Sequence, residues 1–556
     1  MPTNTKSSAG ARWWLLLAAG IYSISIAATE PPFRGDAWLY VSDALSVRAG
    51  TAHAGSLWEF GHLLWRPLIW ALSPVLVKWV PAGAWSPNLK VLYGLVWIGR
   101  LSGLAAVLLM ADLLRRIARR PAAIVVPLLT MVWGAAFLGY AQAGGPYIPA
   151  LALSILALWW NVAGPGSRAT RAVVAGLVLA GAVAIWFPFV LIIPASACAC
   201  LFLEEENVDK RYRWALLTMV TSGAVLLATF AWGAALAGHG SLREFPIWMQ
   251  SSSHGWQQNR TVLRAVSGCS RLFIELGSGG IALKRFLIKD PYNSVSAAAL
   301  FFRVLWRIAL FWIFIFAIAF GALRSAPGRR MMKLALIAVL PVLFFALALL
   351  EPSSPERFLP ILPFPLLALA VVWDTDRKAL AIRMAAIAFA ALLPIMNGPT
   401  MVAGASAERI QSKTRLEEFR RCAGQSDLLM TPVLTDPLWV FSNVALFDPV
   451  NLPEPISMEP IITAAKANTG DWRRTFAEHV LETWRRGAEV WITKAALADR
   501  PPASTYWVEG DDPRVRWRDL PEFLRPLEYD KETPDSEGFR RIHHSLQNEA
   551  ALRKLL

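Results

Sequence analysis

Residues 121–167 read PAAIVVPLLTMVWGAAFLGYAQAGGPYIPALALSILALWWNVAGPGS and contain no Asp, Glu, Lys or Arg. A helix needs about 20 mostly apolar residues to cross the roughly 30 Å of a bilayer's hydrocarbon, so this stretch is long enough for two helices. Gly144, Gly145 and Pro146 interrupt it, and such residues favour a turn. The stretch therefore predicts a hairpin of two membrane-spanning helices.

The composition of the whole chain also indicates a membrane protein. Of its 556 residues, 55% are hydrophobic and 17% are charged, whereas soluble domains carry about 25% charged residues. The formal net charge is +15, but Lys and Arg lie in short clusters between apolar runs, which favours membrane orientation over nucleic-acid binding. We therefore expect the lipid bilayer as a partner and no nucleic acid. The 4 cysteines show no metal-ligand spacing and indicate neither a disulfide scaffold nor a structural zinc site.

Uncharged runs bounded by charged residues predict about eleven spanning helices in all. The first run lies between Arg12 and Glu30 and is interpreted as a retained anchor. The C-terminal quarter differs, because short β-like runs, amphipathic stretches and Pro-rich turns replace the long apolar runs. We expect an α-helical polytopic transmembrane module over 1–402 and a soluble α/β domain over 403–556. The other runs lie near 88–111, 121–140, 147–163, 172–187, 189–203, 214–237, 300–323, 334–350, 358–373 and 384–402.

Orientation follows from the rule that basic clusters gather in cytoplasmic loops. All the basic clusters of this chain can face the cytoplasm if two conditions hold: the proline-broken segment 63–81 lies in the membrane interface, and 172–203 forms two short spans. The second condition stays open, because that run is long for one helix and short for two. The N-terminus is then cytoplasmic in a multi-pass inner or cytoplasmic membrane protein, and loops 30–87 and 238–299 and the domain 403–556 lie outside.

The first external loop carries the candidate chemistry. Asp36 lies just past the first span, and a carboxylate at the edge of a low-dielectric region can act as a general base. It can equally cap an interfacial helix. His53 and His62 could bind a metal ion with an acid, but their spacing matches no standard ligand pattern. The possible supporting residues in this loop are Asp43, Glu59, His62 and Arg66.

Five motifs follow one another along the chain. They are an acidic motif after the first span at 35–40 (GDAWLY), an interfacial segment at 62–68 (HLLWRPL), a span with a basic end at 100–120, the hairpin turn at 140–146 and a late span entered through 355–363 (PERFLPILP). Their order resembles that of the GT-C membrane glycosyltransferases, in particular the protein O-mannosyltransferase and aminoarabinose transferase superfamily. Those proteins move a sugar from a polyprenyl phosphate on the outer face of the membrane.

The chain departs from the family pattern at three places. Ala37 stands where the family often has a second acid, Gly144 and Gly145 stand where it often has an acid, and 185–187 (IWF) replaces a common lysine. The interfacial segment also lacks the usual His-Pro-Pro. These departures leave the detailed reaction open.

The resemblance implies a transferase that uses a polyprenyl-phosphate sugar donor and an acceptor that is a glycan, a lipid or a protein. Asp36 would deprotonate the acceptor hydroxyl, and cations would bind the leaving phosphate. A divalent metal ion is compatible with this chemistry, but no residue pattern selects one. The phosphate-binding candidates are Arg357 first, and then Arg303 and Arg307, four apart on one expected helical face. Arg100, within a span, and Glu351 and Glu356, beside Arg357, are possible supporting residues.

Two other classes of function fit the sequence. A flippase or transporter of a lipid-linked saccharide would predict broken helices or ionisable residues at the midplane and repeats between halves, and neither is evident. A non-catalytic membrane assembly subunit would bind a partner through its external domain, and the missing second acid at Ala37 favours it.

Overall fold

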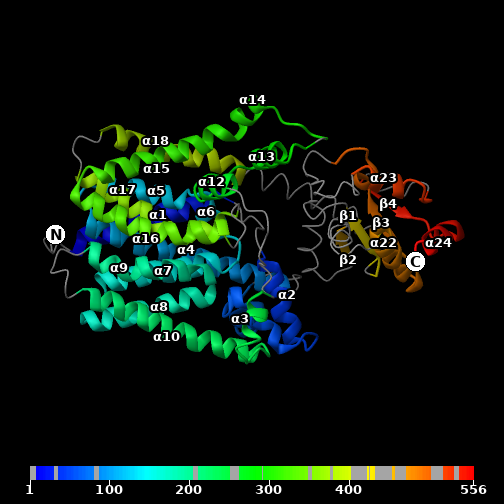
Figure 1. Cartoon of the computed structure of the whole chain (residues 1–556), viewed down its shortest axis with the longest axis horizontal. Helices are drawn as coiled ribbons and strands as arrows, with labels where there is room; N and C mark the ends of the chain where they lie inside the picture. The colour runs from blue at the N-terminus through cyan, green and yellow to red at the C-terminus, as the bar shows by residue number, and fades with distance from the viewer. Residues whose placement is uncertain are drawn as a thin grey trace. The chain divides into compact units, whose positions relative to one another are not determined.

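The computed structural model describes residues 8–29, 36–80, 87–203, 211–250, 262–290, 292–348, 354–375, 380–401, 422–424, 426–431, 454–457, 471–501, 517–530 and 538–556. The chain divides into two compact units (Figure 1). The first comprises Met1–Gly83, Lys90–Glu275 and Arg307–Ala403, and the second comprises Ala84–Leu89, Leu276–Trp306 and Gly404–Leu556.

The first unit is a bundle of helices that run roughly alongside one another (Figure 1). In chain order the elements are α1 (Ser8–Ala27), α2 (Ala37–Arg48), η1 (Ala54–Leu57), η2 (Phe60–His62), α3 (Trp65–Trp79), α4 (Pro87–Ile117), α5 (Ala122–Val132), α6 (Ala135–Tyr140), α7 (Tyr147–Ala163), α8 (Arg168–Ile185), η3 (Phe187–Ile192), α9 (Ile193–Leu203), α10 (Tyr212–Leu236), α11 (Phe245–Gln250), α12 (Val262–Ser270), α15 (Trp306–Leu323), α16 (Ala326–Ala348), η6 (Pro355–Ile361), α17 (Pro363–Thr375) and α18 (Leu380–Pro399).

Six helices among the described residues are long and apolar enough to cross a membrane, and the bent pair η6 and α17 makes a seventh if it is one span. They identify a multi-pass membrane protein. The six are α4, α8, α10, Ala297–Leu323, Ala326–Leu347 and α18. Four shorter apolar helices, Arg12–Ala27, Ala122–Val132, Tyr147–Ala163 and Phe187–Leu203, coincide with other runs that were expected to span. Eleven crossings therefore stay a prediction.

The uncharged run 121–167 is helical on both sides of the expected turn, with α5 and α6 before it and α7 after it, and the two crossings stay a prediction. Gly144 in the turn has a φ of +75°, a conformation that glycine adopts without steric cost. The first arm differs from expectation because it breaks between α5 and α6, where Gly134 is extended. The N–H groups that begin α6 are bonded from outside, since Ala135 N donates to Phe273 O at 3.1 Å and Ala136 N to Leu272 O at 3.2 Å.

The run 172–203 is divided into two helices, as expected. The division comes at Trp186, which has extended backbone angles, just before Pro188 in η3. Of the two helices, α8 meets the length criterion for a span, and the helix Phe187–Leu203 is shorter. The segment 63–81 forms α3, which contains Pro74. Its expected position in the membrane interface stays a prediction, as do the two crossings of 172–203.

The second unit contains a four-stranded sheet in the order β2-β1-β3-β4. The strand β1 pairs in parallel with β2 and β3, and β4 is antiparallel to β3. One face of the sheet packs on α22 in a core that includes Met430, Ile492, Phe476 and Val480. The described elements are α13 (Ser278–Ile288), α14 (Ala297–Leu300), the π-helical turn η5 (Phe301–Leu305), β1 (Leu428–Thr431), β2 (Glu454–Ser457), α22 (Trp472–Arg485), β3 (Val490–Thr493), η8 (Lys494–Leu497), α23 (Asp519–Leu524), β4 (Phe539–Ile542) and α24 (Leu546–Arg553). Two expectations for the C-terminal domain stay predictions: that it begins at residue 403, and that it is a soluble domain on the outer side of the membrane.

Candidate functional site

Asp36 lies at the N-terminus of α2, in the N-cap position, but its side chain makes no capping hydrogen bond to the helix. The Tyr40 hydroxyl lies 3.5 Å from its Oδ2 atom. Asp36 and Tyr40 are four residues apart and so share one face of α2. The capping role that the sequence allowed for Asp36 is therefore not the one its side chain takes in the structure.

Tyr40 links this carboxylate to a buried histidine. Its Oη lies 2.8 Å from His62 Nε2, in η2, and the ring centroids are 4.8 Å apart. Tyr40 is 1% exposed and His62 is fully buried. Burial holds the pKa of Tyr40 well above its ordinary value, and the charges of Tyr147, Asp36 and Glu59 raise it further. The Tyr40 hydroxyl therefore stays protonated.

A cluster of charges lies next to this pair. Arg66 Nη2, in α3, is 3.2 Å from Asp43 Oδ2 in α2 and 2.9 Å from the buried Glu59 Oε2. Its guanidinium also lies over the Tyr40 ring, 5.4 Å from the centroid. Burial raises the pKa of Asp43, and Arg66 partly opposes that shift. The four supporting residues predicted from the first loop thus come together, and Arg66 joins α3 to α2.

Tyr147 interacts with residues of the first loop and with residues of η6, which comes much later in the chain. It begins α7, directly after the turn of the hairpin, and its hydroxyl is hydrogen-bonded to Tyr40. The charges of Glu356, Asp36 and Arg357 also influence that hydroxyl. Tyr147 is therefore affected by two candidate residues, Asp36 and Arg357, that are more than three hundred positions apart in the sequence.

Arg357 lies in η6 and is 8% exposed. Its Nε is buried without a hydrogen-bond partner, and Arg357 makes no ion pair with any residue that the structure describes. The adjacent Glu356 is turned to another group, because its Oε2 accepts a hydrogen bond of 2.5 Å from Tyr140 Oη. A buried guanidinium in this condition is a strong binding group for an anion.

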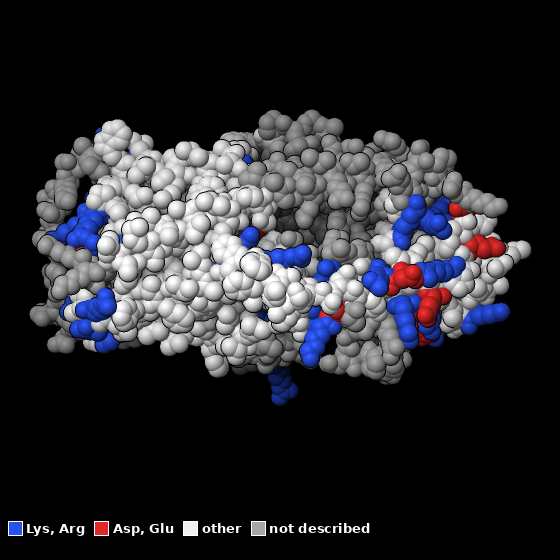
Figure 2. All heavy atoms as spheres, turned by 90° about the horizontal axis from the view of Figure 1, so that it is seen from above, with Lys and Arg blue, Asp and Glu red and all other residues white. Residues whose placement is uncertain are grey.

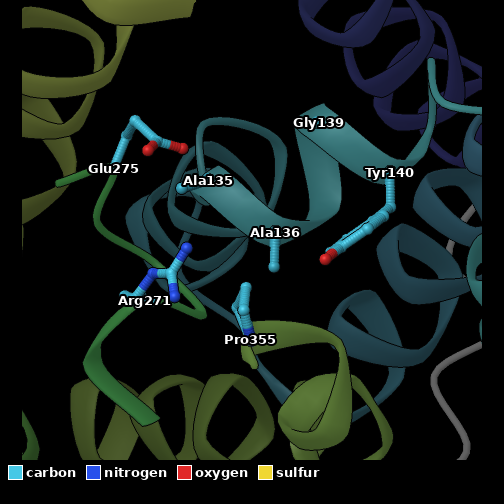
Figure 3. A pocket seen from close by; sticks show the side chains of 7 residues that line it. All are labelled: Ala135, Ala136, Gly139, Tyr140, Arg271, Glu275 and Pro355. Carbon is cyan, nitrogen blue, oxygen red and sulfur yellow. The ribbon is translucent and has the colours of Figure 1, made fainter. Parts of the chain in front are cut away.

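A small hollow, with room for about one water molecule, lies beside Tyr140 (Figure 3). Figure 3 shows the Tyr140 hydroxyl directed into the space between α6 and Pro355, with Arg271 and Glu275 on the opposite side. The sequence analysis missed Arg271 and Glu275. A signal was present, since they are the only charged residues between 265 and 283 and are four positions apart. The lining residues are Ala135, Ala136, Gly139, Tyr140, Arg271, Glu275 and Pro355.

Asn397 holds the wall of this hollow in place. Its Nδ2 donates to Trp133 O at 2.7 Å and to Phe273 O at 2.8 Å, and its Oδ1 accepts from Glu275 N at 2.8 Å. The residue is fully buried in α18. Three segments distant in sequence are thereby joined by one side chain: the break after α5, the segment after α12, and α18.

Three other candidate residues, Arg100, Arg303 and Arg307, are considered by their own surroundings. Arg100 Nη2 donates to Gln142 Oε1 at 3.1 Å, and Gln142 Nε2 donates to Thr29 Oγ1 at 2.8 Å. Arg303 is exposed in the second unit, within η5, and Arg307 in α15 donates to Glu275 O at 3.2 Å.

A π-helical turn, Phe301–Leu305, contains Arg303 and precedes Arg307, and the phosphate-binding role of these two arginines stays a prediction. Glu351 lies outside the described residues. Within the described part of the chain, no group of three or more His, Cys, Asp or Glu side chains is arranged to hold a metal ion.

No protein-family model matches the chain, and no curated protein matches it. In fold, however, the chain is similar to GT-C membrane glycosyltransferases, which confirms the resemblance drawn from its motifs. The particular neighbour is the aminoarabinose transferase ArnT from Cupriavidus metallidurans in the apo state, with a TM-score of 0.53 and 12% identity over 96% of this chain and 98% of that one. The same protein bound to undecaprenyl phosphate gives a TM-score of 0.49 and 11% identity over 97% of this chain and 99% of that one. At such identities the likeness establishes the fold.

Proposed function

We propose that this protein is a membrane glycosyltransferase that moves a sugar from a polyprenyl-phosphate donor to an acceptor on the extracytoplasmic face. The observation that carries the proposal is the buried guanidinium of Arg357, whose Nε has no hydrogen-bond partner among the described residues. A carboxylate and a buried, unpaired guanidinium are the two groups that such a transfer requires at one carbon atom. The fold similarity to ArnT is consistent with this chemistry.

Asp36 is the proposed base. Glycosyl transfer passes through an oxocarbenium-like state, and the acceptor hydroxyl attacks more readily when a carboxylate removes its proton. Asp36 is not engaged in capping α2, and its Oδ2 atom lies 3.5 Å from the Tyr40 hydroxyl. Such a carboxylate is positioned to receive a proton from a group that enters the site.

Arg357 is the proposed binding group for the leaving phosphate. An unpaired guanidinium that is buried costs free energy, and a bound phosphate would offset that cost through bidentate hydrogen bonds. Arg271, on the wall of the hollow, supplies a second positive charge in the same region. Two cations near a phosphate stabilise the negative charge that it gathers as the glycosidic bond breaks.

The helical unit would hold the chemistry, and the C-terminal domain would serve the acceptor. Every candidate residue for base and phosphate binding that converges here belongs to the first unit. We therefore propose that 403–556 recognises the acceptor or covers the site on the outer side of the membrane.

The test is a transfer assay with the purified, full-length protein in detergent. The donor is a polyprenyl-phosphate sugar, a membrane extract supplies acceptors, and release of polyprenyl phosphate and labelling of the extract are both followed. Asp36→Asn preserves size and removes basicity, so turnover should fall by about two to four orders of magnitude. The matched control is Asp499→Asn, an exposed aspartate of the second unit that pairs with Arg525.

Two outcomes would contradict the proposal. A wild-type protein that binds the donor and translocates it in vesicles, but forms no covalent product, would indicate a flippase. Equal activity of Asp36→Asn and wild type would remove the proposed base.

A further inference from the structure

The pair formed by Tyr40 and His62 has no part in binding the phosphate, yet it is attached to the proposed base. The Tyr40 hydroxyl is 3.5 Å from Asp36 Oδ2 and 2.8 Å from His62 Nε2. A hydroxyl in this position can accept a proton from one neighbour while it donates its own to the other. Both residues are buried, so bulk water does not compete for these hydrogen bonds.

We propose that Tyr40 and His62 form a proton relay that carries the acceptor's proton away from Asp36, a role that rests on the proposed glycosyl transfer. Asp36 alone touches the acceptor. Tyr40 and His62 act through it and restore its carboxylate form, which is the form needed for the next turnover.

The acceptor O–H bond breaks, its proton binds Asp36 Oδ2, and the acceptor oxygen forms the new bond to the sugar carbon. The old bond from that carbon to phosphate breaks, and the electron pair leaves on the phosphate oxygen. Tyr40 Oη then takes the proton from Asp36 as its own proton moves to His62 Nε2. Asp36 ends as a carboxylate and His62 as an imidazolium.

The surroundings allow a tyrosine to conduct a proton without becoming charged. Burial and the charges of Asp36 and Glu59 oppose ionisation of Tyr40, and Arg66 favours it. The relay passes one proton in as another leaves, so no tyrosinate is formed. Tyr147 lies against the His62 ring at 6.4 Å between centroids, and His62 N is bonded to Glu59 O at 3.2 Å. This backbone hydrogen bond to Glu59 holds the main chain of His62 in position.

The negative charges near the histidine would stabilise the imidazolium. Asp36 and Glu59 face Tyr40 from α2 and from the segment before η2, and Arg66 is neutralised in part by Asp43 and Glu59. The charged and titratable groups around the relay are thus one tyrosine, three carboxylates and one arginine: Tyr147, Asp36, Asp43, Glu59 and Arg66. His62 can hold the proton until product leaves.

The experiment uses the full-length protein and two relay variants. Tyr40→Phe keeps the ring that packs under Arg66 and on His62 and removes only the bridging hydroxyl. His62→Gln keeps a hydrogen-bonding group and removes the titratable one. His53→Gln serves as the control, because His53 is exposed and bonds only to the backbone of its own turn. Thermal unfolding in detergent confirms that each variant is folded.

We expect turnover to fall about tenfold to a hundredfold in both relay variants, with donor affinity unchanged. In the wild type, kcat/KM should fall as the pH drops and His62 becomes protonated, because a protonated histidine cannot receive the proton. His62→Gln should lose that acid limb. The solvent isotope effect of the wild type should indicate more than one proton in motion, and that of Tyr40→Phe a single one.

Failure of this proposal is distinguishable from failure of the proposed function. An inactive wild type would overturn the glycosyl transfer itself. An active wild type whose acid limb and isotope effect persist in both relay variants would overturn the relay alone. Reduced turnover with an unchanged pH profile would assign the pair a structural role and also overturn the relay.

Discussion

Burying a guanidinium without an anionic partner costs several kcal/mol, because the charge loses its hydration and gains no compensating interaction. Arg357 is in this condition among the described residues, while its neighbour Glu356 is bonded to Tyr140. A phosphate would supply two acceptor oxygens in the plane of the guanidinium, and an ammonium group cannot match that geometry. The identity of the cation should therefore matter as much as its charge.

Arg357→Lys should weaken binding of polyprenyl phosphate by about tenfold or more, and Arg357→Gln should weaken it further, since each 1.4 kcal/mol of lost binding is a factor of ten. Binding is measured with the unglycosylated lipid phosphate, so the result does not depend on turnover. The control is Arg303→Lys, at an exposed arginine of the second unit that was also a phosphate-binding candidate. If Arg303→Lys weakened binding as much as Arg357→Lys, the phosphate would have to be placed elsewhere.

Some of the site could be predicted residue by residue from the sequence, and some could not. Asp36 and Arg357 stood out because each follows or precedes an apolar run within a family-like motif. The sequence offered no sign that Tyr147 would join them, since its role depends on where the hairpin turn lies relative to α2 and η6. The second cation of the region, Arg271, was hidden in a segment that read as a Gly-rich external loop.

At the scale of helices, runs of apolar residues and the glycines and prolines that interrupt them predicted the structure where a segment's own sequence determines it. The uncharged run 121–167 and its Gly-Gly-Pro turn predicted the hairpin, and the proline in 172–203 predicted that this run would be divided. The break between α5 and α6 could not be predicted. It depends on the carbonyls of Leu272 and Phe273, which bond α6 from a segment more than a hundred residues later.

Asn397→Ala should loosen the wall of the hollow. The substitution leaves two carbonyls and one N–H without their partner, which should cost about 1–3 kcal/mol of stability. The matched control is Asn161→Ala in α7, because Asn161 is also buried and its Nδ2 bonds two carbonyls, Ser196 O at 2.7 Å and Ala197 O at 3.1 Å. Those contacts lie away from the hollow.

Both asparagine variants should unfold at lower temperature in detergent, and only Asn397→Ala should also weaken donor binding at a temperature where both are folded. The reason is that Asn397 bonds the backbone of Glu275, which lines the hollow. Equal donor affinity in the two variants would show that the hollow is not part of the donor site.

At the scale of the whole molecule, the distribution of charge is the main physical evidence for orientation. On the face drawn in Figure 2 the helical unit is largely uncharged along its length, and Lys and Arg gather at the end where Figure 1 labels α9. A charge-free stretch between charged ends is typical of a surface that faces lipid. Basic residues resist transfer across the membrane, so the end that carries them is expected to be cytoplasmic.

Single-cysteine labelling tests this orientation in sealed, right-side-out vesicles. The four native cysteines, Cys198, Cys200, Cys269 and Cys422, are first replaced by serine. Pro165→Cys lies in the exposed turn between α7 and α8, and Lys554→Cys lies at the exposed end of α24. A membrane-impermeant maleimide should label Lys554→Cys at once and Pro165→Cys only after the membrane is permeabilised. The reason is that the turn before α8 adjoins the basic cluster of Arg168 and Arg171, whereas 403–556 is expected outside.

The two positions give four distinguishable outcomes, because each reports one side of the membrane independently. The opposite pattern would invert the whole protein and move the proposed site to the cytoplasmic face. Labelling of both positions in sealed vesicles would place an even number of crossings between them, and protection of both would do the same with the domain inside. Each crossing that is added or removed reverses the side of every later segment. An even number between the two positions would therefore require that one segment expected to cross there, such as the short helix Phe187–Leu203, does not cross, or that a further segment does.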